Sequence, residues 1–194
     1  MKIIYLLFDL LRKAVKGFGL LSLRLRWGAC GRHVRFWPFD SYFTYKNIFI
    51  GNDVYIGQRA TFISTESTIH IGNKVLFGPG VTIVTGDHSI SKIGVFIKDN
   101  RTKEPEDDQP VVIEDDVWVG SNVTILKGVR VGRGSVLASC ALILADILPY
   151  TIVGGVPCKI IKTRFTLAQA IEHEKILYRE GDRFPPNQLR HLTD

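Results

Sequence analysis

The sequence predicts an all-β core, a parallel β-helix built from six-residue repeats, with an α-helix at each end of the chain. Three observations predict this fold: a regular spacing of large aliphatic residues, smaller residues at a fixed place in each repeat, and glycines between them. The large positions are Ile113, Val119, Ile125, Val131, Leu137 and Ile143. A period of six fits neither a 3.6-residue helix nor an alternating strand, so it indicates a short strand and a turn, repeated.

A second position in each repeat lies four residues after the large one. It holds Val117, Val123, Val129, Ser135, Ala141 and Ile147. Three repeats close a triangular coil of about eighteen residues, in which the large side chain fills the interior and the smaller one lets the corner close. We expect Gly120, Gly128, Gly132 and Gly134 to occupy turns that need a permissive backbone. Six consecutive matches argue against a β-sandwich with coincidental spacing.

The N-terminal segment, residues 1–27, is predicted to form an amphipathic helix. Residues 1–35 carry eight Lys and Arg against one Asp, a net charge of +7, whereas the whole chain carries +6. An apolar stripe along residues 2–16 opposes a basic side. Two interpretations stay open, a helix packed on the β-helix and an interfacial helix on an anionic membrane. The apolar run is too short to span a bilayer.

The basic residues do not indicate a nucleic-acid partner, because no aromatic-interleaved basic patch or known binding motif follows them. Three cysteines, Cys30, Cys140 and Cys158, cannot all pair within one chain. With no secretory signal, they indicate reduced thiols. We therefore expect a cytoplasmic protein, with peripheral contact at the inner face of the membrane as the alternative that the basic helix leaves open.

The repeats are expected to form one domain over residues 28–163. Their spacing begins at Cys30, is broken around Pro38, resumes at Ile50 and slips by three residues near 65–68. Residues 89–110 break the spacing completely. Since a loop this long in a repeating fold is typically functional, its place directly after the His at 88 predicts that it frames a site. We interpret its acidic run, residues 104–108, as solvated or Arg-paired, because no calcium-loop spacing is present.

The C-terminal part, residues 164–194, is predicted to hold a helix and a tail. The stretch PYTIVGGVP (149–157) is expected to end the β-helix with turn residues. Thr166 and Gln169 have the spacing of a capping box, which opens a helix to about Glu180, where Gly181 stops it. The Pro-Pro pair at 185–186 indicates a loose tail.

Three stretches carry a resemblance to a known family: GDHSI (86–90), VVIEDDVWVGSNVTILKGVRVGRGSV (111–136) and PYTIVGGVPCKIIKTRF (149–165). The chain resembles the hexapeptide-repeat acyltransferases, in particular the sugar O-acetyltransferases of the galactoside, maltose and nodulation-factor type and those of capsule or O-antigen assembly. The resemblance implies a left-handed parallel β-helix and acetyl-CoA as co-substrate. It also implies a saccharide acceptor (a polysaccharide or a lipid-linked or nucleotide-linked sugar) and a homotrimer with active sites at subunit interfaces.

The resemblance also implies that His88 is the general base. An alcohol is a poor nucleophile unless a base takes its proton, and imidazole titrates near neutrality. Asp87 and Glu66 are candidates for orienting the acceptor, with a turn position as the alternative for Asp87 and orientation of His88 as the alternative for Glu66. For the histidines at 33, 70, 173 and 191 we expect structural roles. We predict no metal site.

Five further residues match cofactor positions of the family. Trp118 matches a tryptophan near the pantetheine path, Ser121 and Ser139 match contacts to amides and thiol, and Lys159 and Lys162 match contacts to the CoA phosphates. Packing on the outside of the coil is the alternative for Trp118, and simple solvation is the alternative for the lysines. The family usually has a Thr-Lys pair where this chain has Leu and Ala at 144–145.

Three other functions fit the sequence less well. A catalytically inactive repeat scaffold is disfavoured by the presence of His88 together with Trp118 and the basic C-terminal pair. A serine acetyltransferase normally carries a larger helical N-terminal domain. A γ-type carbonic anhydrase on this fold needs three zinc histidines, and only His70 and His88 lie in the repeats.

Overall fold

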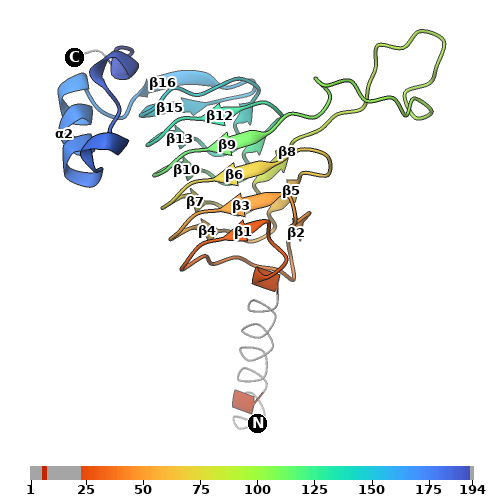
Figure 1. Cartoon of the computed structure of the whole chain (residues 1–194), viewed down its shortest axis with the longest axis horizontal. Helices are drawn as coiled ribbons and strands as arrows, with labels where there is room; N and C mark the ends of the chain where they lie inside the picture. Colours follow the sequence, from red (N-terminus) through yellow and green to blue (C-terminus); the bar gives the residue numbers. More distant parts are fainter. Residues whose placement is uncertain (1–5, 8–22, 193–194) are drawn as a thin grey trace.

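The computed structural model describes residues 6–7 and 23–192, and in them short strands stack into three sheets around a triangular prism (Figure 1). Each complete circuit of the chain, here called a coil, gives one strand to each sheet, so the strands of a sheet are parallel, except for the last strand of the chain, which is antiparallel to its neighbour. The fold is a left-handed parallel β-helix, as predicted. A long loop projects from one side of the prism, and a helix lies at the C-terminal end of the prism.

The three sheets are named A, B and C. Sheet A holds β1 (Ala29–Cys30), β3 (Ile48–Ile50), β6 (Ile69–Ile71), β9 (Val111–Ile113) and β12 (Arg130–Val131). Sheet B holds β4 (Tyr55–Ile56), β7 (Leu76–Phe77), β10 (Trp118–Val119), β13 (Val136–Leu137), β15 (Thr151–Gly154) and β16 (Lys159–Thr163). Sheet C holds β2 (Tyr42–Phe43), β5 (Thr61–Ile63), β8 (Thr82–Val84), β11 (Thr124–Ile125) and β14 (Leu142–Ile143). The edges of the prism are named by the sheets that meet there.

The six-residue spacing marks the side chains inside the prism. The large aliphatic residues from Ile113 to Ile143 are at most 1% exposed, and the smaller ones four residues later are at most 8% exposed. Aromatic rings take over near the N-terminal end, where Phe43 packs on Phe62 at 5.3 Å and Phe62 on Phe77 at 5.4 Å between ring centroids. Burial of this continuous apolar column is the main source of stability.

In most turns, the residue three positions after the large aliphatic residue has a positive φ angle, in the left-handed region. This place is held by Asp116, Asn122, Gly128, Gly134 and Cys140, whose φ angles lie between 55° and 75°. The prediction for Gly120 and Gly132 was wrong in its reason, because neither has a positive φ. An added Cβ would lie 2.6 Å from the Ser139 nitrogen at Gly120 and 2.6 Å from the Pro149 nitrogen at Gly132. At these two positions glycine is needed because the next coil leaves no space for a Cβ.

The coils differ in length at only one edge once the chain has passed β3. Val112 pairs with Arg130, 18 residues further on, whereas Phe49 and His70 are 21 apart and His70 and Val112 are 42 apart. The excesses of 3 and 24 residues correspond to the slip near residue 65 and to the loop. Both follow a strand of sheet C and precede a strand of sheet A, so both lie at the C–A edge.

The C-terminal end differs from the prediction in two places. The stretch expected to be a turn contains β15, which extends sheet B in parallel before β16 pairs with it in the antiparallel direction. The expected loose tail is packed, because it contains the 3₁₀ helix η2 (Pro186–Leu189), and Leu189 and Leu192 are at most 2% exposed. Both leucines join a small core around Tyr150 and Ala170.

The predicted C-terminal helix is present as α2 (Leu167–Leu177), followed by the 3₁₀ helix η1 (Glu180–Asp182). Its capping box is confirmed: Thr166 Oγ1 accepts from the Gln169 nitrogen at 3.3 Å, and Gln169 Oε1 accepts from the Thr166 nitrogen at 3.1 Å. The helix ends three residues before the expected position. Buried Glu174 fixes it to the last coil by accepting hydrogen bonds from Arg133 Nη1 at 2.9 Å and from the Tyr150 hydroxyl.

Of the predicted N-terminal segment, residues 1–27, the structure describes 6–7 and 23–27: Leu6, Leu7, Leu23 and Arg24 are helical, and Trp27 is buried in the core of the β-helix. The rest of the predicted helix lies outside the described residues. Both interpretations of this segment therefore stay predictions. Within residues 6–7 and 23–192, no helix has the length and apolar content needed to cross a bilayer.

The close approach of coils at Gly120 yields a stability prediction. Gly120→Ala should lower the free energy of unfolding by about 1–3 kcal/mol, because its Cβ would press on the backbone of the next coil. Gly181→Ala is the matched control, since nothing lies within 4 Å of a Cβ there, and it should change stability by less than about 0.5 kcal/mol. Urea denaturation measures both, and equal stability of the two variants would contradict the packing argument.

Candidate active site

A cavity of about 260 Å³ at the C–A edge brings together the three residues predicted for the chemistry. Glu66, Asp87 and His88 all line it, with Lys103 and Asp108 from the returning end of the loop. Glu66 belongs to the three-residue insertion after β5, and the other two open the long loop after β8. The two irregular stretches of the repeat therefore border one hollow.

Asp87 is held by an ion pair that fixes the start of the loop. Its Oδ2 lies 2.8 Å from Lys127 Nζ, which also donates to the Glu106 carbonyl at 2.7 Å. The Asp87 nitrogen donates to the Asp107 carbonyl at 2.7 Å. These contacts set the main chain immediately before His88. The His88 side chain is exposed and has no hydrogen-bond partner among the described residues, so its ring nitrogens are free to meet a substrate.

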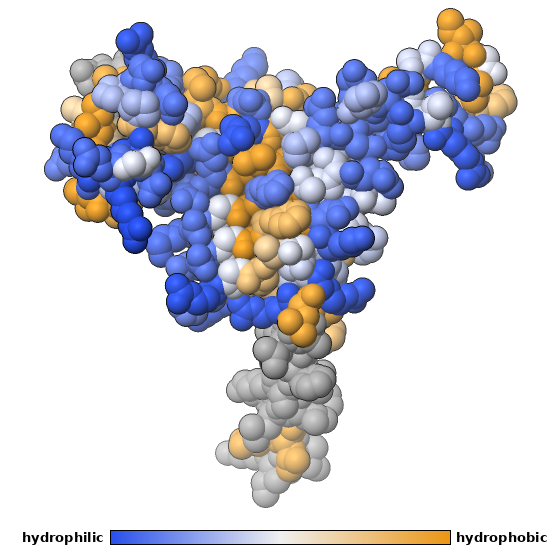
Figure 2. All heavy atoms as spheres, viewed as in Figure 1, coloured by the Kyte–Doolittle hydropathy of each residue, from blue (hydrophilic) through white to orange (hydrophobic). Residues whose placement is uncertain are grey.

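The long loop is closed at its base and open at its tip. Gly86 and Asp108 form an antiparallel bridge, and Lys103 Nζ lies 2.7 Å from Asp108 Oδ2. In the acidic run Glu104 and Glu106 are exposed, as the solvated alternative expected, and the carboxylate of Asp108 pairs with a lysine. No arginine pairs with the run among the described residues. The tip exposes Ile93 and Phe96, at 99% and 83%, and it is the apolar end of the projection in Figure 2.

The residues predicted for the cofactor lie on another side of the prism. Trp118 is 53% exposed on the outer face of sheet B. It pairs with Val136, Val136 pairs with Ile152, and Ile152 pairs with Lys162, so tryptophan and lysine share that face. Lys159 pairs with Gly154 on the same strands.

The two serines lie beside this face, at the B–C edge. Ser121 follows β10 and Ser139 follows β13, at equivalent places in consecutive coils. The Cys140 nitrogen donates to the Ser121 carbonyl at 2.8 Å, which links the two turns. None of the five cofactor candidates lines the His88 cavity. Within one chain the candidates therefore form two groups at different edges, with sheet C between them.

Leu144 and Ala145 follow β14 and so lie at the C–A edge, the same edge as His88. Both are exposed. Lys127 follows β11 at this edge, one coil below them, and it was missed by the sequence argument. Its place in the repeat, two residues after Ile125, could have located it at the C–A edge, but not beside Asp87.

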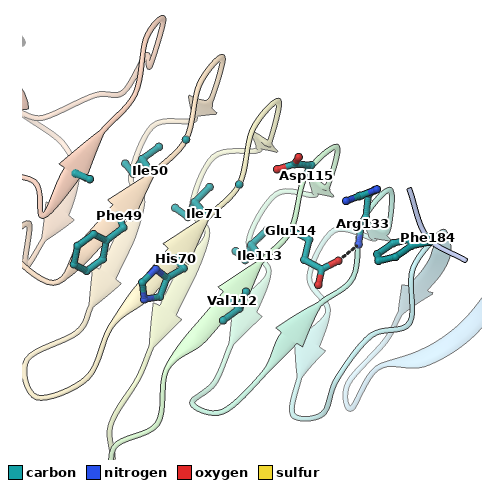
Figure 3. A pocket seen from close by; sticks show the side chains of 13 residues that line it. Phe49, Ile50, His70, Ile71, Val112, Ile113, Glu114, Asp115, Arg133 and Phe184 are labelled. Carbon is teal, nitrogen blue, oxygen red and sulfur yellow. Dashed lines mark hydrogen bonds between the residues drawn. The ribbon is translucent and has the colours of Figure 1, made fainter. Parts of the chain in front are cut away.

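A larger hollow of about 480 Å³ lies on the outer face of sheet A, where Figure 2 shows apolar side chains and Figure 3 shows its lining. His70 lies in it, stacked on Phe49 with ring centroids 4.8 Å apart, and its Nε2 is 3.0 Å from Thr68 Oγ1. Glu114 accepts from the Arg133 nitrogen at 2.9 Å. These groups are engaged with one another, so we regard the smaller cavity as the candidate site.

Comparisons with known proteins agree with this architecture. The family described as "Bacterial transferase hexapeptide (six repeats)" matches residues 110–145. A solved hexapeptide-repeat-containing acetyltransferase from Vibrio cholerae aligns with a TM-score of 0.67 and 30% identity, covering 77% of this chain and 81% of that one. The chain belongs to the hexapeptide-repeat acetyltransferases. Within this family, the Vibrio cholerae protein complexed with acetyl coenzyme A aligns with a TM-score of 0.65 and 32% identity over 74% of each chain.

A sequence relative in the hexapeptide-repeat acetyltransferases is the galactoside O-acetyltransferase of Lactococcus lactis subsp. lactis (strain IL1403). It is 35% identical over 123 residues, which are 63% of this chain and 56% of that protein. The chain therefore spans little more than half the length of this curated relative.

Proposed function

We propose that the chain is an acetyl-CoA-dependent O-acetyltransferase that acts on a hydroxyl of a saccharide. The observation that carries this proposal is the shared cavity of His88, Glu66 and Asp87, which sets an unengaged imidazole beside carboxylates. Carboxylates accept hydrogen bonds from sugar hydroxyls. The acetyl coenzyme A complex of the Vibrio cholerae relative and the name of the Lactococcus lactis relative support the donor and the acceptor class.

In the proposed reaction, His88 takes the proton of the acceptor hydroxyl as its oxygen attacks the carbonyl carbon of the thioester. The new C–O bond forms, the C–S bond breaks, and the thiolate leaves with the proton that the imidazolium returns. Glu66 is free to hold a second hydroxyl of the acceptor. Asp87 has a different role, because its ion pair with Lys127 fixes the backbone that presents His88.

The cofactor is proposed to lie against the outer face of sheet B. Trp118 packs along the pantetheine arm, while Ser121 and Ser139 hydrogen-bond its amides and thiol end. Lys159 and Lys162 are exposed at the C-terminal end of this face, where they bind the phosphates of acetyl-CoA.

A complete site needs a second copy of the chain, because the base and the cofactor residues lie at different edges. We propose a homotrimer in which the C–A edge of one subunit meets the B–C edge of the next. Closed cyclic symmetry then makes three equal sites. The apolar tip of the 89–110 loop supports this assembly, since exposed apolar patches of this kind typically mark contact surfaces.

Replacing the proposed base should stop the chemistry without unfolding the protein. His88→Ala should lower kcat for acetyl transfer by about 100-fold or more, since a general base contributes at least that much. Release of free thiol from acetyl-CoA in the presence of candidate saccharides measures the rate. His70→Ala is the matched control, an exposed histidine on sheet A, and should keep its activity. Full activity of the His88 variant would disprove the proposed mechanism.

The shared site can be tested by mixing two inactive variants. His88→Ala loses the C–A contribution, and Trp118→Ala/Lys159→Gln/Lys162→Gln loses the sheet B contribution. After joint unfolding and refolding in equal amounts, about one quarter of the sites should regain both intact halves, with activity to match. Each variant refolded alone is the control. No gain on mixing, with mixed oligomers present by mass spectrometry, would mean that each site is built by one chain.

A further inference from the structure

A second cavity lies at the C–A edge, on the N-terminal side of the His88 cavity. It measures about 410 Å³ and is lined mainly by the turn after β2, by Arg26, and by Ser64 and Thr65 after β5. Thr65 also lines the His88 cavity, so the two hollows adjoin along the edge. We call this second hollow the Arg26–Lys46 cavity, after its two cations.

The two hollows differ sharply in charge. The Arg26–Lys46 cavity has two cations and no carboxylate in its lining. Neither cation forms an ion pair within the described residues, and the Arg26 guanidinium carbon lies 5.2 Å from the centre of the Tyr45 ring. The His88 cavity is lined instead by three carboxylates and Lys103. Lys127 pairs with Asp87 and Lys103 with Asp108, so Glu66 is the lining carboxylate without an ion pair among the described residues.

The floor of the Arg26–Lys46 cavity is already hydrogen-bonded. Asn47 Nδ2 donates to the Ser64 and Thr65 carbonyls, each at 2.8 Å, and Thr44 Oγ1 lies 2.9 Å from Ser64 Oγ. Burial raises the pKa of Tyr45 despite the opposing effect of Arg26, so the phenol stays neutral and does not neutralise the cations. The free donors are therefore the ammonium and guanidinium groups, which indicates an anionic ligand.

We propose that the Arg26–Lys46 cavity binds the phosphate or diphosphate of a glycosyl acceptor whose sugar ring enters the His88 cavity. This inference rests on the proposed acetyl transfer and narrows its acceptor to a sugar that carries an anomeric phosphate. Guanidinium and ammonium groups make strong charge-assisted hydrogen bonds to phosphate oxygens. Glu66, the unpaired carboxylate of the neighbouring cavity, repels that phosphate and accepts hydrogen bonds from the sugar, so the charge pattern also sets the direction of the acceptor.

The spacing of the coils fits such a ligand. Tyr45 follows β2 and His88 follows β8, and these strands are two steps apart in sheet C. Paired strands lie just under 5 Å apart, so the two turns are separated by about 10 Å along the prism. A hexose linked to a phosphate through its anomeric oxygen covers this span. A hydroxyl on the far side of the ring then reaches His88.

Binding of inorganic pyrophosphate to the full-length protein tests the site without any acetyl transfer. Isothermal titration calorimetry should show pyrophosphate binding to the unmodified protein, with a Kd that rises about tenfold or more in Arg26→Gln/Lys46→Gln. The matched control is Arg32→Gln/Lys74→Gln, an exposed arginine and an exposed lysine at the A–B edge, with an expected change below about twofold. No binding to the unmodified protein, or equal loss in both pairs, would overturn the proposal.

His88→Ala separates this proposal from the proposed function. It should bind pyrophosphate as the unmodified protein does, while it loses acetyl transfer. If His88→Ala stays active, the catalytic proposal fails and the phosphate site is unaffected. If Arg26→Gln/Lys46→Gln binds pyrophosphate normally, the phosphate site fails and the catalytic proposal is unaffected.

The source of the phosphate is distinguished by competition. Uridine diphosphate represents nucleotide-linked sugars, and polyprenyl diphosphate in phosphatidylcholine vesicles represents lipid-linked ones. Displacement of pyrophosphate by either compound, lost in Arg26→Gln/Lys46→Gln, supports the proposal and assigns the source. Displacement by neither compound would contradict an acceptor that carries a phosphate in this cavity.

Discussion

Every coil of this protein must follow the path of its neighbours along the three sheets, because its peptide groups hydrogen-bond to the coils on either side. This requirement leaves room for two inward side chains per six residues, which are the large and the small position of the repeat. It also forces a sharp turn at each edge, and a residue with positive φ supplies the reversal. Where successive turns come closest, as at Gly120, even a Cβ does not fit.

The same requirement explains where the candidate site lies. Extra residues are tolerated only outside the hydrogen-bonded coil, and the large insertions both leave at the C–A edge. The A–B edge is tied instead by a ladder of side chains: Asn52 accepts from the Arg32 nitrogen, Asn73 from the Asn52 nitrogen, and Asp115 from the Asn73 nitrogen. The insertions place Glu66, Asp87 and His88 on a rigid support, which suits the catalytic role proposed for this site.

Much of the core could be predicted because its signal is local and periodic. The inward positions follow directly from the spacing, and the break in the spacing after residue 88 marks the loop that borders the candidate site. The role expected for His88 came from the family resemblance. Other features depend on contacts that spacing does not encode. The Asp87–Lys127 pair spans the whole loop, and β15 lies within a Gly-rich stretch that has the composition of a turn. Arg26 and Lys46 line one cavity because one circuit of the chain brings the second turn onto the first, in a region where the repeat is faint.

The last coil also bears on whether separate molecules associate end to end. A stack of parallel strands has no natural end, and a bare final coil would act as a template for fibre growth by other chains. Here Leu142 in the final sheet C strand is hydrogen-bonded to the Gly155 carbonyl and the Cys158 nitrogen, and β16 runs against the direction of every other strand in sheet B. The reversed strand presents a pattern that a parallel coil does not match, so the hairpin of β15 and β16 terminates the solenoid and protects it from polymerisation.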